Sequence, residues 1–470
     1  MSTAVLWIFF PGLLAVVLLV LNRWERTVVV VSALSTAALA ALALWLPINE
    51  TVEIGTLRLE FVDTWSIFGR LFVLGEADRP ALVMLFLTAS FWYGGAYVAN
   101  TRRSFVPLAL FMVALLTAAI AVEPFLYAAL LIELAVLVSI PFLRPPGAQA
   151  GSGVLRYLTF QTLGVPFILF SGWMLAGTEA NPANEDFGMR AALLLGLGFT
   201  FLLAVFPFHS WIPMLSQEAH PYPVAFILLV LPAAITFFGL GFLDQFAWLR
   251  NSEAAHLSLR TIGALMVCTT GLTAAFQRHL GRILGYAVLF EIGLSLLTIG
   301  FAEGEHTGAF LSLFFASLLP RGLALGVWAL ALTVIRAQRE DLYYRDILGL
   351  AMRFPIAASG LVLAQFAWIG LPLTAGFPVR MALMENIARI SPFALLWIIL
   401  GSFGLVLGGL RTLVVLVTGE DVVPWQVTES GAQRFFLILG MLGLLIVGLF
   451  PKWFLPFFVN LPQAFEQLAP

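Results

Sequence analysis

FPFHSWIPMLSQEAHPYPV, at residues 206–224, and GLPLTAGFPVR, at residues 370–380, are two interruptions in an otherwise apolar chain. Proline removes a backbone hydrogen bond from a helix, and hydrocarbon cannot satisfy the backbone groups that are freed. Such breaks survive only inside protein or against water. One broken segment in each half of a membrane chain points to an ion path built from two structural repeats. We expect the breaks to centre on Pro207 and Pro213 in the first segment, and on Pro372 and Gly376 in the second.

The composition predicts a polytopic integral membrane protein. Of the 470 residues, 61% are hydrophobic and 11% are charged, and the mean hydropathy is +0.99. Soluble domains carry roughly 25% charged residues. The formal net charge of −2 gives no reason to expect nucleic acid as a partner.

The single cysteine, Cys268, excludes an intramolecular disulfide and any cysteine-ligated cluster held by this chain alone. Lys452 is the only lysine, so nearly all basic residues are arginines, which do not deprotonate in proteins. The first apolar run has neither a basic region before it nor a small-residue cleavage site after it. We therefore expect a retained first span rather than a signal peptide.

Apolar runs long enough to cross a bilayer recur along the chain and predict an all-α protein of about fourteen transmembrane helices. We expect the spans near residues 4–22, 27–47, 81–99, 104–122, 124–143, 154–176, 190–215, 222–242, 258–276, 282–301, 307–335, 354–388, 393–418 and 434–456.

The distribution of arginines predicts the orientation. Arginines follow the odd-numbered spans, and the positive-inside bias makes those loops cytoplasmic, so both termini should lie outside. The loop at residues 49–80 then lies outside, and the alternation in its TVEIGTLRLEFVD segment suggests a small surface hairpin. The arginines in question are Arg23, Arg26, Arg102, Arg103, Arg144, Arg278, Arg282, Arg336, Arg339, Arg345 and Arg353.

A similar arrangement occurs twice: a span with a central acid, a span with a basic residue, and a broken span. Because each unit has an odd number of helices, successive copies would be inverted. We expect N-terminal spans and an external loop at 1–103, a first five-helix repeat at 104–242, a second at 258–418, and a C-terminal span at 419–470.

Two glutamates lie near the middle of predicted spans. Glu133 occurs in YAALLIELAVLVSIPF, and Glu291 in GRILGYAVLFEIGLSLLTIG. A charge at the centre of a membrane helix costs about 2.5–3.5 kcal/mol, so each needs compensation. Each is a candidate protonatable site on a proton path, or alternatively a carboxylate that ties two helices together.

Arg321, which follows Pro320 inside an apolar run, and Arg380, at the end of the second break, could act electrostatically on these acids. Arg380 could instead extend toward the membrane interface. His209 could relay protons or only stabilise the helix break. Arg156 opens the sixth span and could point inward, although anchoring at the interface is an equal alternative.

Three further polar residues have weaker indications of function. His220 is expected near a surface, and Gln161 and Gln365 are expected to join helices rather than to relay protons. No phosphate-binding loop, dinucleotide fingerprint, HExxH or CxxC pattern occurs, so we expect no cofactor, nucleotide or metal in this chain.

Residues 104–415 resemble the antiporter-like membrane subunits of respiratory complex I and their relatives in cation/proton antiporters and membrane-bound hydrogenases. PFHSWIP followed by HPYPV is similar to the signature of the seventh and eighth spans, and RILGYAVLFEIG, DILGLAMRFP and GLPLTAGFPVR are similar to later motifs. The HPYPV form looks most like the smaller subunits, called N or M. The resemblance implies fourteen helices, two inverted five-helix units and a polar axis along the membrane midplane.

The resemblance also implies roles for individual residues. Glu133 matches the glutamate of the fifth span, Arg380 falls where the twelfth span carries Lys or Glu, Arg321 falls near a lysine, and Glu291 replaces a histidine. Leu202 and Ala234 fall where the first repeat carries titratable bases, which this chain therefore lacks.

Three functions follow from this comparison. The leading hypothesis is a proton-translocating subunit in the membrane arm of a complex I-like NADH/quinone oxidoreductase in a bacterial or archaeal plasma membrane. It would be surrounded by other membrane-arm subunits, which supply the redox energy. The second is a structural subunit that does not pump, which Leu202 favours. The third is a module of a cation/proton antiporter, a membrane-bound hydrogenase or an ion-coupled inorganic-carbon uptake system.

Overall fold

The computed structural model describes residues 2–46, 48, 51–54, 57–67, 69–143, 151–180, 185–339, 341–419, 427–459, 461–465 and 467–468. Arg144, one of the arginines that predict the orientation, lies outside these residues.

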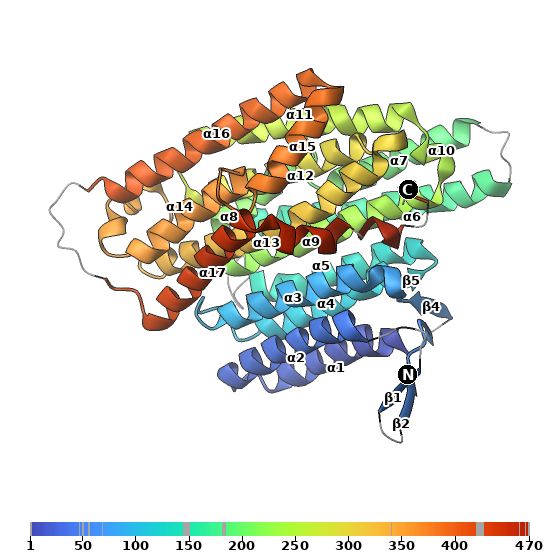
Figure 1. Ribbon diagram of the computed structural model, residues 1–470, viewed down its shortest axis with the longest axis horizontal. Helices are drawn as coiled ribbons and strands as arrows, with labels where there is room; N and C mark the ends of the chain where they lie inside the picture. The colour runs from blue at the N-terminus through green and yellow to red at the C-terminus, as the bar shows by residue number, and fades with distance from the viewer. Residues whose placement is uncertain are drawn as a thin grey trace.

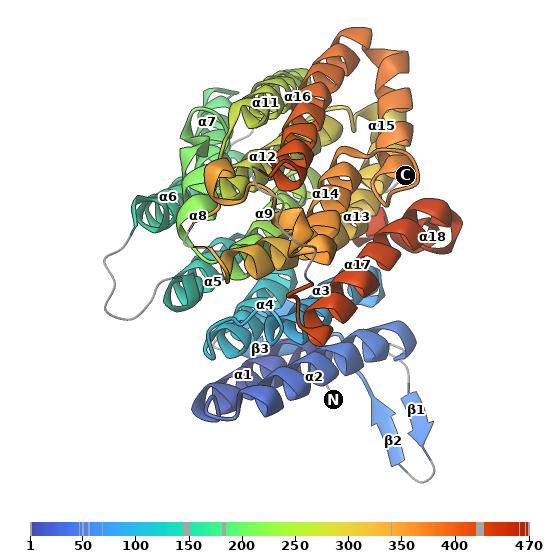
Figure 2. The ribbon, with the colours of Figure 1, turned by 90° about the vertical axis from the view of Figure 1, so that its left-hand side faces the viewer.

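The N-terminal part forms a layer at one end of the molecule (Figures 1 and 2). A π-helical turn, Val5–Phe9, leads into α1, and α2 packs against α3. The predicted hairpin is present, because β1 and β2 pair as antiparallel strands. The elements are α1 (Phe10–Val20), α2 (Glu25–Trp45), β1 (Thr51–Ile54), β2 (Leu57–Glu60), β3 (Thr64–Ile67), β4 (Arg70–Val73) and α3 (Arg79–Ala96).

The first predicted repeat contains a helix that is broken after Leu202. Ala204 has a positive φ of 52°, and the backbone resumes a helix at Trp211 after the short turn Phe208–Ser210. A short strand, β5 (Val122–Glu123), pairs with β4. Its helices are α4 (Phe105–Ala121), α5 (Ala128–Leu143), α6 (Ser152–Ala180), α7 (Glu185–Leu202), α8 (Trp211–Glu218) and α9 (Pro221–Gln245), and the short helix α10 (Ala247–Arg250) follows the repeat.

The second predicted repeat contains a second broken helix, in which a loop separates α14 from α15. Further 3₁₀ turns lie at Glu76–Asp78, Phe125–Tyr127, Gly304–His306, Tyr344–Asp346, Leu350–Met352, Pro451–Trp453 and Leu461–Ala464. Its helices are α11 (Glu253–Phe276), α12 (Leu280–Gly300), α13 (Thr307–Arg336), α14 (Pro355–Ile369), α15 (Phe377–Ile390) and α16 (Pro392–Val417). The C-terminal part that follows contains α17 (Gly431–Leu449) and α18 (Leu455–Val459).

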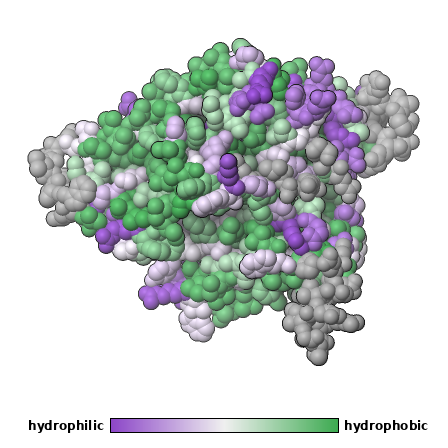
Figure 3. All heavy atoms as spheres, viewed as in Figure 1, coloured by the Kyte–Doolittle hydropathy of each residue, from purple (hydrophilic) through white to green (hydrophobic). Residues whose placement is uncertain are grey.

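Length and composition allow nine helices of the described chain to cross a membrane, and four apolar helices are shorter. The protein is therefore a multi-pass α-helical membrane protein, while the number of fourteen spans stays a prediction. Hydrophobic residues dominate the surface seen in Figure 3, as expected for side chains that face lipid.

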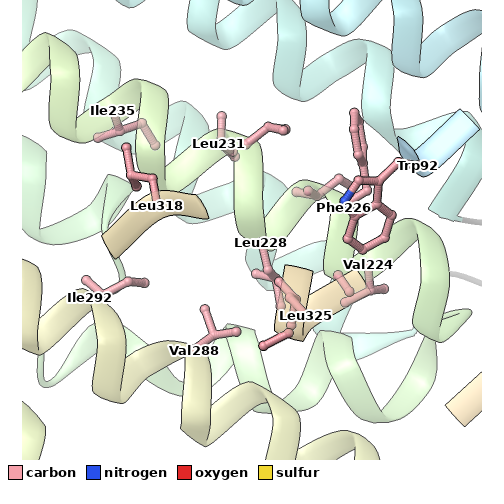
Figure 4. Packing of buried hydrophobic residues seen from close by; sticks show 14 of the residues in the cluster. Trp92, Val224, Phe226, Leu228, Leu231, Ile235, Val288, Ile292, Leu318 and Leu325 are labelled. Atoms are coloured by element: carbon pink, nitrogen blue, oxygen red, sulfur yellow. The ribbon is translucent and has the colours of Figure 1, made fainter. Parts of the chain in front are cut away.

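The centre of the molecule is formed by α9, α12 and α13. In the most apolar stretch of α12, 94% of the residues are buried inside the protein, whereas only 22% are buried in the corresponding stretch of α17. Leu228, Leu231 and Ile235 of α9 lie among the same buried apolar residues as Val288 of α12 and Leu318 of α13 (Figure 4). The first predicted repeat thus meets the second across an apolar interface.

Candidate functional site

One buried glutamate lies between two arginines in the second half of the chain. The Glu291 carboxylate, on α12, is 2.8 Å from Nε of Arg321 on α13. Its other oxygen accepts a hydrogen bond from Nη2 of Arg380 on α15. The residues Glu291 and Arg380 are 4% and 8% exposed. The structure therefore brings together three of the residues that the sequence singled out.

The second helix break positions Arg380. Gly370 ends α14 with a φ of 85°, a conformation that glycine adopts without strain. At Gly376 a Cβ atom would lie 2.2 Å from the Ala367 carbonyl oxygen, so only glycine permits this close approach. Pro372 lies in the loop between them. The break frees the Trp368 carbonyl, which accepts a 2.9 Å hydrogen bond from Nη2 of Arg380.

Neighbouring polar groups hold this cluster in place. Nη1 of Arg321 donates to Oγ of Ser295 at 2.7 Å, and that hydroxyl donates to the Glu291 carbonyl at 2.8 Å. Nε1 of Trp368 donates to the Ala287 carbonyl at 3.0 Å and so joins α14 to α12. Ser295 and Trp368 were not among the residues predicted from the sequence. The spacing of Ser295, one helical turn after Glu291, is a signal that could have found it.

A cavity of about 30 Å³ lies against the cluster, and Glu291, Arg321, Arg380 and Ser317 line it together with apolar residues. A water molecule needs roughly 10–15 Å³ of such space. The cavity is therefore large enough for water. A much larger cavity, of about 1050 Å³, is lined mainly by apolar side chains of α7, α9 and α11.

Glu133 has a different environment. It is half-buried on α5, and one carboxylate oxygen accepts a 2.7 Å hydrogen bond from Thr162 of α6, which the sequence analysis missed. The other oxygen is buried without a hydrogen-bond partner. No ion pair to Glu133 occurs among the described residues, and Arg321 and Arg380 both pair with Glu291 instead. Leu130 and Leu134 beside it are exposed on the surface of the chain.

His209 and Arg156 lie near the first break. Nη1 of Arg156 is 3.2 Å from Oγ of Ser210, and Arg156 is exposed. Of the two alternatives considered for Arg156, the exposed position favours anchoring at the interface. Arg156 precedes Thr162 by six positions, or about 9 Å along a helix. His209 stacks on Phe206, with ring centroids 5.5 Å apart, and its Nδ1 is buried without a partner.

The two prolines on which we expected the first break to centre have different surroundings. Pro207 lies between α7 and the turn that precedes α8. Pro213, which we expected in the break, lies in the first turn of α8. A helix needs no backbone N–H donor there, so the proline is accommodated.

Leu202 and Ala234 occupy the two positions where the resemblance places titratable bases, and both have apolar surroundings. Leu202 is 1% exposed. Ala234 lines a small cavity with Leu229, Ala233 and other apolar residues. The first half of the chain therefore offers Glu133 no basic side chain at either position.

Gln161 joins two helices at the first break, as predicted. Its Nε2 donates to the Leu202 carbonyl at 2.9 Å, a group that the end of α7 frees. The Gln365 amide, in contrast, is buried without a hydrogen-bond partner, so it does not join helices in this way.

We predict that Gln161→Leu lowers the free energy of unfolding by about 1–3 kcal/mol, because the buried Leu202 carbonyl loses its donor. Gln365→Leu is the matched control, since it removes an amide without partners and should be neutral or stabilising. Thermal unfolding of the purified variants measures both. An equal loss of stability in the two variants would contradict the assignment.

His220 lies before the first turn of α9, outside the helix, and its Nδ1 accepts from the Tyr222 backbone N–H. Burial, and then the positive charges of Arg336 and Arg102, lower its pKa from 6.5 to about 4. Arg336 lies close because it donates a hydrogen bond to the Ala219 carbonyl. His220 is therefore neutral at physiological pH.

This pKa predicts how stability depends on pH. The unfolded chain binds a proton near pH 6.5 and the native chain only near pH 4, so stability is complete above pH 6.5 and falls as the pH decreases toward 4. The shift in the His220 pKa accounts for a loss of roughly 3 kcal/mol in the free energy of unfolding. His220→Asn keeps a helix-capping acceptor and should unfold with a shallower dependence on pH between 7.5 and 4.5. Identical pH profiles for the two proteins would refute this role of His220.

No group of three or more His, Cys, Asp or Glu side chains that could hold a metal ion occurs in the described part of the chain. Cys268 is buried and free.

Comparison with known proteins gives a consistent result. Residues 153–408, more than half of the chain, match the family described as "NADH:quinone oxidoreductase/Mrp antiporter, TM". NADH-quinone oxidoreductase subunit N of Halorhodospira halophila is 24% identical over 333 residues, which are 65% of this chain and 66% of that protein. The match thus spans slightly less than two thirds of that relative.

Solved structures share the fold over nearly the whole chain. A chain of respiratory complex I from Thermus thermophilus with bound NADH superimposes with a TM-score of 0.77 at 22% identity, covering 98% of this chain and 100% of that one. A chain of the Mrp complex from Dietzia sp. DQ12-45-1b gives a TM-score of 0.80 at 16% identity, covering 99% and 98%. The all-α membrane fold predicted from the sequence is confirmed, and the number of fourteen transmembrane helices stays a prediction.

Proposed function

Because the chain belongs to the NADH:quinone oxidoreductase/Mrp antiporter transmembrane family, we propose that it is a proton-translocating, antiporter-like subunit in the membrane arm of a complex I-like oxidoreductase. The observation that carries the proposal is the buried carboxylate of Glu291, held between Arg321 and Arg380 beside a cavity that admits water. Buried ionisable groups inside a membrane protein mark ion pathways.

The chemistry of the side chains limits how protons move. The two arginines do not release protons, so they set the local field instead of carrying protons. Protonation changes are therefore assigned to Glu133, Glu291 and His209. The carboxyl of Glu133 has no ion-pair partner in the described structure, so it can gain and lose a proton without breaking a salt bridge.

Coupling between the two halves follows from charge. If Glu291 is protonated, both arginines lose their counter-charge, and the field along the membrane midplane becomes more positive. A more positive field favours release of a proton from other carboxyl groups, Glu133 among them. Redox chemistry belongs to partner subunits in this proposal, and this chain needs no cofactor.

The partners and the placement in the membrane are part of the proposal. Exposed apolar residues around Glu133, including Leu134, offer α5 as a surface for a neighbouring membrane subunit. The loops that carry arginines face the cytoplasm of a bacterial or archaeal cell, and both termini lie outside the plasma membrane.

A second candidate is a structural subunit that does not pump. The apolar surroundings of Leu202 and Ala234 favour it, because a relay through the first half then lacks a base beside Glu133. The likeness in fold to the Dietzia Mrp chain supports a third candidate, a cation/proton antiporter module.

Mutation of Glu133 tests the proposal. In vesicles that contain the whole complex, Glu133→Gln should lower the number of protons moved per electron while electron transfer continues. Glu253→Gln, an exposed acid at the start of α11, is the control and should behave like the wild type. A normal proton-to-electron ratio in Glu133→Gln would favour the structural subunit. Proton movement without an associated redox complex would favour the antiporter module.

A further inference from the structure

The Glu291 cluster contains more positive than negative charge. Arg321 and Arg380 both contact Glu291, and no other carboxylate forms an ion pair with either guanidinium among the described residues. An arginine does not neutralise itself by losing a proton. One positive charge is therefore left unbalanced in a site where all three side chains are mostly buried.

Part of the guanidinium of Arg380 also lacks a hydrogen-bond acceptor. Its Nη2 atom binds Glu291 and the Trp368 carbonyl, whereas its Nη1 atom is buried and has no partner. The side chain is 9% exposed, and the residue lines the 30 Å³ cavity. A buried donor of this kind calls for an acceptor inside the cavity.

The ends of the broken helix do not supply the missing negative charge. The carboxyl end of α14 carries about half a negative charge near Trp368, and the amino end of α15 carries about half a positive charge near Gly376. Both Trp368 and Gly376 line the cavity, so the two contributions roughly cancel.

We propose that the cavity between Arg321, Arg380 and the start of α15 binds one small monovalent anion of the size of chloride. Its volume exceeds the roughly 10–15 Å³ that a water molecule needs and is far below the roughly 300–1000 Å³ of pockets for organic ligands. Water would fill the space but would leave the positive charge unbalanced. A halide balances the charge and accepts from Nη1 of Arg380.

The anion gives the cluster a function beyond the ion pair. With the anion bound, Arg321 and Arg380 are neutralised by two negative partners, Glu291 and the halide. Protonation of Glu291 then leaves one positive charge instead of two, which lowers the cost of that step. The site uses the same cluster as the proposed proton path, but its test measures binding. A failure of proton translocation therefore leaves the anion site standing.

The test is a titration of the purified full-length protein with chloride, or with bromide, against gluconate at constant ionic strength. We expect a saturable rise of the melting temperature with either halide and none with gluconate, because a ligand that binds the native state stabilises it. Bromide should appear in a structure as anomalous density next to Nη1 of Arg380. Equal melting temperatures in halide and gluconate would show that only water occupies the cavity.

Two variants change the charge of the cluster in opposite directions. Arg380→Gln leaves Glu291 and Arg321 as a neutral pair, so halide affinity should fall by about tenfold or more. Glu291→Gln leaves two unbalanced arginines, so halide affinity should rise by about tenfold. Unchanged affinity in Arg380→Gln, or weaker binding in Glu291→Gln, would overturn the proposal.

Arg260→Gln is the matched control for a general effect of arginine removal. Arg260 pairs with Glu303 at a partly exposed position away from the cavity. Its replacement should leave the halide titration unchanged, and an equal loss in this variant would contradict the site. If a cluster variant fails to fold, the bromide density in the wild type decides the question.

Discussion

Replacement of Glu291 by alanine is expected to lower the free energy of unfolding by about 3–5 kcal/mol, one of the two largest effects predicted for this protein. The carboxylate is the shared partner of Arg321 and Arg380. Breaking a buried ion pair by removing one partner leaves an uncompensated buried charge, and here two arginines lose their partner together. Proton translocation by the complex should be lost in the same variant.

The experiment compares unfolding of Glu291→Ala with that of Glu303→Ala. Glu303 also pairs with an arginine, Arg260, but the two side chains are 37% and 27% exposed. A pair at such a position contributes about 0–1 kcal/mol. If the two variants lose the same stability, burial of the Glu291 cluster does not have the energetic weight assigned to it.

Replacement of Gly401 by alanine is expected to have the second large effect. At this crossing of α16 with α11, an added Cβ atom would lie 2.2 Å from the Val267 carbonyl oxygen and 2.9 Å from the ring of Phe290. The helices must separate, which costs about 1–3 kcal/mol or more. Phe290 precedes Glu291 in sequence, and its ring lies 5.2 Å from the Arg380 guanidinium carbon. The clash should therefore disturb the ion cluster as well.

Gly443→Ala provides the control for Gly401→Ala. Gly443 is also a helical glycine, but a Cβ atom there would meet no atom within 4 Å. Alanine should be neutral or stabilise α17 by up to about 1 kcal/mol through its helix propensity. Unfolding of both variants measures the effect on helix packing. A halide titration of each variant, with and without Arg380→Gln, measures the effect on the Glu291 cluster. Equal stability of the two variants would show that the crossing can adjust without cost.

The two helix breaks could be predicted because their cause is local. Prolines that occur together with polar or glycine residues in one short apolar stretch disrupt a helix for local reasons, so residues 206–224 and 370–380 could be located in advance. A single proline is not sufficient, because Pro232 lies inside α9 and Pro320 lies inside α13. Pro213 is the exception, because its effect depends on where α8 begins, and that point is set by the turn before Trp211.

The sequence by itself determined that the chain is an apolar, multi-pass helical protein, which residues are costly in a membrane, and which family it resembles. These properties depend on residue type and order along the chain. Only the tertiary structure decided which charges meet. Glu291 and Arg380 are 89 residues apart, and the path of the chain around the second break brings them together. Glu133 has the same side chain as Glu291, yet it meets Thr162 instead of an arginine. The physical reason is that the free energy of a buried charge depends on its neighbours within a few ångströms, and folding selects them.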